Sequence, residues 1–95
     1  MFDKMKQLME MKKQADVLKK QLDAAIVDVS RGGIKIRISG SQRFQAIDIA
    51  PDYLKAESKQ KLEQDLLNSL NAAIAQSQQV AAQKMKEVMP GMPGF

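Results

Sequence analysis

The 95-residue sequence predicts an α+β fold with a long N-terminal helix, a three-stranded antiparallel meander and a long C-terminal helix. Apolar residues recur with a helical period over residues 1–25 and again over residues 58–89. Between these stretches the period changes to two, over residues 26–50. We expect residues 1–89 to form a single domain and residues 90–95, which hold two Pro-Gly pairs, to form a C-terminal tail.

The first helix is predicted by a heptad pattern in which seven of eight seam positions are apolar. No Gly or Pro interrupts residues 1–25, so we expect a helix of about 24 residues and roughly 36 Å. Because a small domain cannot cover such a helix along its whole length, the seam predicts a second copy or another partner. The seam consists of Met1, Lys4, Leu8, Met11, Ala15, Leu18, Leu22 and Ala25.

Three strands are predicted next. Residues 26–30 form the first, Arg31-Gly32-Gly33 is a turn signal, and residues 34–39 alternate most regularly. In this second strand three isoleucines share one face, while Lys35, Arg37 and Ser39 share the other. After a turn at residues 40–42, residues 43–50 form the third strand, which Pro51 ends.

The third strand has a less regular pattern, because Phe44 and Ala46 point one way while Ile47 and Ile49 point the other. A β-bulge that shifts the register would explain this pattern. Partial cover on both faces, for example by a partner subunit, would also explain it. A third alternative is that Phe44 and Ala46 are exposed.

The second helix is predicted to start near Ser58, or a few residues earlier, and to run to about Met89. Its middle is rich in Asn, Gln, Ser and Ala and carries little charge, so it is covered on more than one side or stays soluble through its amides. Residues of one helical face recur every three or four positions: Leu62, Leu66, Leu70, Ala73, Ile74, Ser77, Ala81, Met85 and Val88.

The composition argues against most enzymes. The chain has no His and no Cys, which excludes imidazole or thiol catalysis, zinc sites of the usual N/S type and disulfides. We therefore expect neither a catalytic site nor a metal or cofactor. No apolar run approaches the roughly 18 residues of a membrane span, and a cytoplasmic protein without a membrane partner is expected.

A stripe of lysines on the first helix is the main candidate binding feature. The net charge is +4, and its excess lies in the first half of the chain. Lys6, Lys13 and Lys20 recur every seven residues, with Lys12 and Lys19 beside two of them. Ammonium groups about 10.5 Å apart suit a phosphate backbone, because each neutralised phosphate releases condensed counterions. The alternative is a solvated face with intrahelical pairs to acids four residues away.

A second basic patch is predicted on the polar face of the second strand. Lys35 and Arg37 lie there, with Arg31 and Arg43 near them. If this face is open, Lys35 and Arg37 are candidates for phosphate contact. If it packs against a partner, they are interface or edge-protecting charges.

The order and spacing of three segments carry a resemblance to a known family. These are Gly32 to Gly40, the Ile47-Asp48-Ile49-Ala50-Pro51 segment, and a helix with Leu66-Leu67 and Ala72-Ala73. Together with Pro90-Gly91, they make nearly the whole chain resemble the YbaB/EbfC family of small bacterial nucleoid-associated proteins. The resemblance implies a homodimer with the meanders at its centre, whose projecting helices grip double-stranded DNA in the nucleoid. It favours DNA binding as the role of the lysine stripe.

We therefore expect a non-enzymatic homodimer that binds duplex DNA mainly through phosphates, with little sequence specificity. The alternative is a clamp-like scaffold dimer whose projecting helices hold another protein, since the apolar seam fits that role too. Adhesion of the basic helix to a membrane surface is less favoured, because acids lie among its lysines and no Trp anchors its apolar side.

Overall fold

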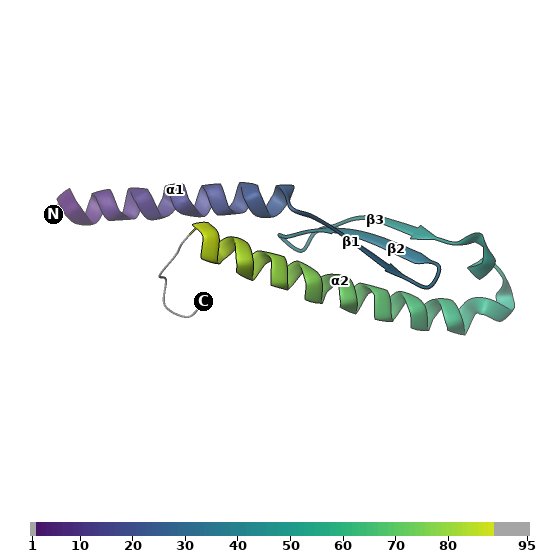
Figure 1. The fold of residues 1–95 in the computed structure, drawn as a ribbon. Helices are drawn as coiled ribbons and strands as arrows, with labels where there is room; N and C mark the ends of the chain where they lie inside the picture. Colours follow the sequence, from purple (N-terminus) through teal and green to yellow (C-terminus); the bar gives the residue numbers. More distant parts are fainter. Residues whose placement is uncertain (1, 89–95) are drawn as a thin grey trace.

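The structure, a computed structural model, describes residues 2–88, so the predicted tail and the predicted helix ends Met1 and Met89 lie outside the described residues. The α+β fold and its element order are confirmed (Figure 1). The elements are α1 (Phe2–Ala24), β1 (Ile26–Arg31), β2 (Ile34–Ser39), β3 (Phe44–Ile49), the short 3-10 turns η1 (Pro51–Tyr53) and η2 (Ala56–Ser58), and α2 (Lys59–Val88).

The three strands form one antiparallel sheet in the order β1-β2-β3, and α2 lies along one of its faces (Figure 1). The predicted inward side chains of β2, Ile34, Ile36 and Ile38, are each at most 1 % exposed. Val27 and Val29 of β1 are buried beside them. Because burying one such side chain stabilises a fold by about 1.5–3 kcal/mol, β2 is the centre of the core.

The contact line of α2 consists of small residues spaced four apart. Ser69, Ala73 and Ser77 are fully buried, and their small side chains let the helix backbone approach the sheet closely. The Ser77 hydroxyl donates to the carbonyl oxygen of Ser39 at 2.7 Å, and the Ser69 hydroxyl donates to that of Asp65 at 2.7 Å. Larger residues of the predicted face flank this line and are half-buried: Leu62, Leu66, Leu70 and Ile74.

Ser39 is buried at the end of β2. The sequence places it on the polar face of β2 and leaves open whether that face is covered, and in the structure Ser39 is only 1 % exposed. Its hydroxyl lies 2.7 Å from that of Ser41 and accepts the backbone N–H of Arg43. The tight β2–β3 turn therefore covers Ser39. The alternation of residues along the strand does not predict this burial.

A β-bulge resolves the irregular pattern of the third strand. Ile38 is opposite Phe44, and Arg37 is opposite Ala46, so Gln45 has no residue opposite it. Ile36 pairs with Ile47 in the following register. Paired residues share a face, so the bulge brings the large apolar residues of β3 to the side of the sheet that α2 occupies.

Much of β3 is exposed even so, because α2 lies over β1 and β2 and not over β3. Phe44 is 43 % exposed and Ile47 is 49 % exposed. Within residues 2–88 no further strand pairs with the outer edge of β3. The sheet thus ends in an edge that is apolar and unpartnered.

Tyr53 fastens the β1–β2 hairpin to the rest of the fold. Its hydroxyl donates to Asp65 Oδ2 of α2 at 2.7 Å and accepts the backbone N–H of Gly33 at 3.3 Å. A Cβ atom at Gly33 would lie 2.7 Å from the Tyr53 ring, so only glycine permits this packing. The neighbouring Gly32 has φ of +57°, which a two-residue hairpin turn requires.

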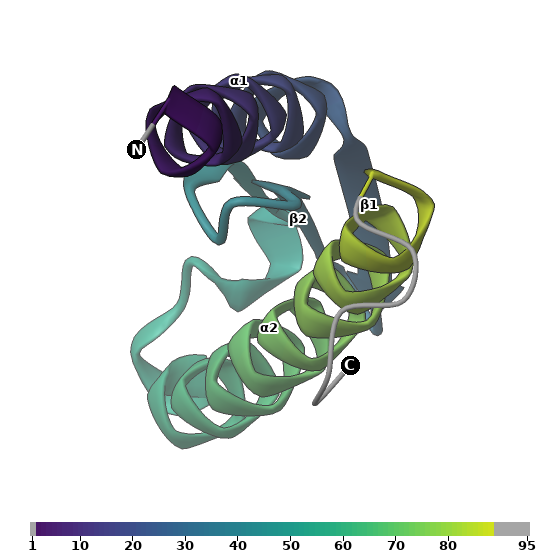
Figure 2. The same cartoon turned by 90° about the vertical axis from the view of Figure 1, so that its left-hand side faces the viewer.

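α1 projects away from the domain. Leu18 is its one buried residue among those whose side chains the structure describes, and the N-terminal half of the helix extends beyond the end of α2 (Figures 1 and 2). The molecule measures 67 × 21 × 16 Å. Its radius of gyration is 18.5 Å, whereas a compact chain of this length has about 12 Å. A large part of α1 therefore has no cover from its own chain.

Candidate nucleic-acid interface

Five lysines occupy the outward half of α1. Seven residues make almost two helical turns, so Lys6, Lys13 and Lys20 follow one line along the helix. Residues of this line lie well around the helix from the buried Leu18, but Lys13 also borders a hollow that Val17 shares with the end of α2. α1 has six lysines, of which Lys4 lies on the seam; the other five are all exposed: Lys6, Lys12, Lys13, Lys19 and Lys20. The five lysines are therefore exposed on a projecting rod, and helical spacing places Asp16 and Asp23 among them.

Acids on the same helix do not pair with these lysines in the structure. The ion pairs found among residues 2–88 join Arg37 to Asp28, Lys59 to Glu63 and Lys84 to Glu87, and none lies on α1. Intrahelical pairs of exposed residues are worth only about 0.3–0.5 kcal/mol, so a phosphate group displaces them easily. The lysine ammonium groups remain accessible to an external anion.

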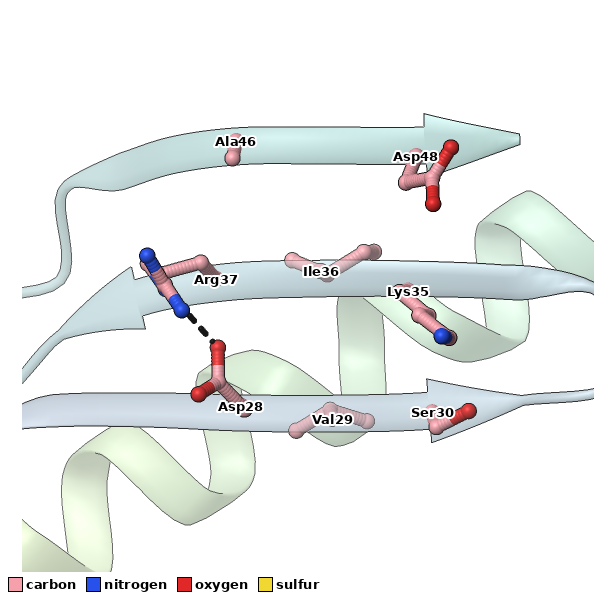
Figure 3. Close-up of a pocket in the computed structure, with 8 residues that line it drawn as sticks. All are labelled: Asp28, Val29, Ser30, Lys35, Ile36, Arg37, Ala46 and Asp48. Atoms are coloured by element: carbon pink, nitrogen blue, oxygen red, sulfur yellow. Dashed lines mark hydrogen bonds and ion pairs between the residues drawn. The ribbon is translucent and has the colours of Figure 1, made fainter.

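The predicted basic patch on the sheet has a different character (Figure 3). Lys35 and Arg37 lie on the face of the sheet that α2 leaves open, beside a shallow hollow of about 500 Å³. Asp28 of β1 is opposite Arg37, and Asp48 of β3 is opposite Lys35. Two acids thus stand among the two bases, and this face carries no net charge.

Arg37 is already paired on this face. Its Nε donates to Asp28 Oδ1 at 2.9 Å, and this hydrogen bond, with the attraction between the two charges, raises the pKa of Arg37. Both side chains are more than half exposed, so the pair itself stabilises the fold little. A phosphate would have to compete with Asp28 for the guanidinium.

The structure brings Lys35 and Arg37 together but keeps them apart from the lysines of α1. In Figure 1 the sheet and α1 follow one another along the molecule. Sequence reasoning missed Asp28 and Asp48 as members of the basic patch. The signal was available, because both occupy polar positions of alternating strands, but their partners depend on the register and on the bulge.

Among residues 2–88 no group of three or more acidic, His or Cys side chains could hold a metal ion. Within that same range, neither helix combines the length and the apolar character that crossing a membrane requires.

Comparison with known proteins identifies the family. The sequence profile of the YbaB/EbfC DNA-binding family matches residues 1–92. The chain belongs to the YbaB/EbfC DNA-binding family. The resemblance seen in the sequence is therefore confirmed over nearly the whole chain.

Curated relatives agree with this assignment to YbaB/EbfC. The chain is 28 % identical over 93 residues to a nucleoid-associated protein of Chloroflexus aurantiacus, covering 96 % of this chain and 93 % of the relative. It is 31 % identical over 91 residues to a nucleoid-associated protein of Nocardia farcinica, covering 86 % of this chain and 83 % of the relative.

A solved structure shares the YbaB/EbfC-type fold. The crystal structure of an uncharacterized protein from Helicobacter pylori superposes with a TM-score of 0.69 at 19 % identity. The match covers 93 % of this chain and 91 % of the other. The helix–meander–helix arrangement therefore has a counterpart in a crystal structure.

Proposed function

We propose that this chain is a nucleoid-associated protein that binds double-stranded DNA as a homodimer, mainly through phosphate contacts and with little sequence specificity. One observation carries the proposal: five exposed lysines follow the outward side of a helix that projects from the domain. Membership of the YbaB/EbfC DNA-binding family supports DNA as the polyanion. The proposed location is the nucleoid within a bacterial cytoplasm, since the relatives are named nucleoid-associated proteins.

The chemistry of lysine favours backbone contact over base recognition. An ammonium group is a point charge without the planar fork that arginine uses to recognise guanine, and α1 contains no arginine. Each phosphate that a lysine neutralises releases counterions, so the affinity falls steeply as salt rises. From Lys6 to Lys20 the stripe spans about 21 Å, a length that follows several phosphates of one strand.

The homodimer accounts for the apolar surface that one chain leaves uncovered. Phe44 and Ile47 are about half exposed on the side of the sheet that α2 occupies, at the outer edge of β3, which pairs with no further strand within residues 2–88. A second copy placed along the edge of β3, on the side of the sheet that α2 occupies, would cover these side chains across a two-fold axis. In this arrangement the sheets lie at the centre and the α1 rods point outward.

Lys35 and Arg37 stay candidates for DNA contact within this proposal. We expect them to contribute less to the affinity for DNA than the lysines of α1. Asp28 forms an ion pair with Arg37, and Asp48 lies opposite Lys35 in the strand register. The two carboxylates offset the two positive charges, so this face attracts a polyanion only weakly.

A triple variant of the stripe tests the proposal. We expect Lys6→Gln, Lys13→Gln and Lys20→Gln together to weaken duplex binding at least about tenfold and to make the log–log salt dependence shallower by about 2.7 per protomer, because three phosphate contacts are lost. Duplex titrations at several salt concentrations measure both quantities, and sedimentation verifies that the assembly is unchanged.

A second triple variant, Lys55→Gln, Lys59→Gln and Lys61→Gln, is the matched control. It removes the same charge from the opposite end of the molecule, around η2 and the start of α2. We expect it to change affinity much less. Equal losses in the two variants would remove the stripe from the mechanism and leave only the net charge.

The clamp-like scaffold dimer remains the second candidate, and the exposed apolar side chains of α1 favour it. Met5, Leu8, Met9 and Met11 are 55–66 % exposed, and methionine-rich helix faces adapt to varied protein surfaces. This alternative predicts a saturable protein partner and DNA binding that vanishes near physiological salt, whereas the proposed function predicts binding that persists there.

A further inference from the structure

α1 joins the sheet without a flexible linker. The helix ends at Ala24, β1 begins at Ile26, and only Ala25 lies between them. The C-terminal end of the helix lies beside the β2–β3 turn (Figure 1). Because one connecting residue leaves little freedom, the direction of α1 depends on what this end of the helix contacts.

Gly40, the first residue after β2, supports this end of α1. It is buried, and its backbone N–H donates to the Ala25 carbonyl oxygen at 2.8 Å. A Cβ atom at Gly40 would lie 3.1 Å from the Leu22 carbonyl oxygen and 3.4 Å from the Ala25 Cβ. Since the nearest of these atoms belongs to the helix backbone, a side chain at residue 40 has to displace the helix itself.

Glycine is required at residue 40 for space and not for backbone conformation. In the described part of the chain, Gly32 is the glycine with a positive φ, so the conformation of Gly40 does not itself demand glycine. The neighbouring Ser39 is held firmly. Ser77 of α2 donates to its carbonyl oxygen at 2.7 Å, and its own backbone N–H donates to the Arg43 carbonyl oxygen at 2.9 Å. An added side chain therefore moves α1 and not the sheet.

Two contacts define the line of α1. Gly40 lies against its last turn at Leu22, and Leu18, one turn earlier, is buried. The rise of about 1.5 Å per residue places Leu18 about 6 Å from Leu22, and Gln7 about 16 Å beyond Leu18. If the helix turns about Leu18, a displacement of Leu22 grows about threefold at Gln7. A small side chain at residue 40 thus changes the direction of the whole projecting half.

We propose that Gly40 is a positioning residue for the lysines of α1. Because it has no side chain, the end of the helix lies directly against the β2–β3 turn, and this contact fixes the direction in which α1 projects. In the proposed dimer, the directions of the two α1 helices set the distance between their lysines, which has to match the phosphates of a stiff duplex. The last step rests on the proposed function, whereas the direction of α1 does not.

Distances between spin labels measure the direction of α1. The natural chain has no Cys, so Gln7→Cys on α1 and Gln76→Cys on α2, both at exposed positions, carry the labels. An excess of unlabelled protein isolates the distance within one chain. We expect Gly40→Val to shift the mean label distance by at least about 2 Å. Gly40→Ala should shift it in the same direction by less, and it carries the comparison if the larger side chain prevents folding.

Gly33→Ala is the matched control. Gly33 precedes β2 as Gly40 follows it, and a Cβ atom there would lie 2.7 Å from the Tyr53 ring, at the end of the strand remote from α1. We expect this variant to lower the urea midpoint and to keep the label distance of the natural chain. An unchanged distance in both Gly40 variants would overturn the proposal. An equal shift in Gly33→Ala would also overturn it, because any loss of stability would then move the helix.

Two polyanions test the consequence for DNA binding. A duplex is stiff, whereas single-stranded oligo(dT) bends to follow displaced helices. We expect Gly40→Val to weaken duplex binding at least about threefold more than oligo(dT) binding, and Gly33→Ala to weaken neither. Equal weakening for both polyanions would overturn the positioning role in DNA binding. Unchanged duplex affinity despite a shifted label distance would contradict the proposed function and would leave the control of helix direction by Gly40 supported.

Discussion

Tyr53 joins three parts of the molecule through one hydroxyl group. The phenol donates to Asp65 and accepts from the Gly33 backbone, so the β1–β2 hairpin, η1 and α2 are held together at one point. The hydrogen bond to Asp65 is the main cause that raises the pKa of Tyr53, while the hydrogen bond from Gly33 acts in the opposite direction. The neutral phenol is therefore the form that the fold stabilises.

The raised pKa of Tyr53 predicts a pH dependence of stability. The contribution is fully present below the pKa of the unfolded chain, about 10, and is lost as the pH rises through the higher value of the folded state. We expect Tyr53→Phe to be less stable than the wild type near neutral pH. The difference should narrow above about pH 10, where the wild-type phenol ionises. Urea midpoints of both proteins across this pH range measure it, and a constant difference would contradict the assigned role.

Tyr53 and the buried serines mark the limit of sequence reasoning at this scale. The sequence placed Tyr53 only in a connection before the second helix, since nothing local reveals a hydrogen bond to Asp65, twelve residues away. Ser77 was placed on the correct helical face, but its bond to the Ser39 carbonyl depends on how closely α2 approaches the sheet. The exposed lysines of α1 needed only helical spacing, so they could be predicted.

β2 and β3 are neighbouring strands, but only β2 lies in the core of the domain. β2 lies under α2 and supplies the most buried isoleucines, whereas β3 lies beyond the edge of α2. Ile36 and Ile47 are opposite each other in the register, and they are 1 % and 49 % exposed. This pair allows the two roles to be separated experimentally.

Alanine substitution of Ile36 should affect mainly folding, and alanine substitution of Ile47 mainly the association of two chains. Ile36→Ala leaves a cavity in the core, so we expect the free energy of unfolding to fall by about 2–5 kcal/mol. Ile47→Ala should lower the free energy of unfolding of the single chain much less. It should instead weaken association by about 1 kcal/mol or roughly fivefold, if the second copy covers β3. Denaturation and sedimentation across protein concentrations distinguish the effects. Unchanged association for Ile47→Ala would place the subunit contact elsewhere.

The elements themselves were largely predictable, because each has its own period. α1, the three strands and α2 occur where the apolar pattern changes between helical and alternating spacing. The irregular third strand left a bulge and two-sided cover as alternatives, since a pattern of apolar residues does not reveal which residue lacks a partner. Gln45 can be identified as the residue without a partner only when the strand partners of Ile38 and Arg37 are known.

The shape of the whole molecule follows from an imbalance between helix length and domain size. A sheet of six-residue strands can support α2 on one face, but it cannot cover a 23-residue α1 that starts from its end. The heptad seam already predicted this shortfall from the sequence. Its consequences are exposed apolar side chains and exposed lysines on one projecting helix.

A salt series of duplex binding, with the mass of the protein determined in the same buffers, tests the central claim most directly. The account predicts a particle of two chains whose affinity is similar for unrelated duplexes and falls linearly on a log–log plot as salt rises. A single chain of 10.6 kDa that fails to bind duplex DNA even at about 20 mM salt would contradict it.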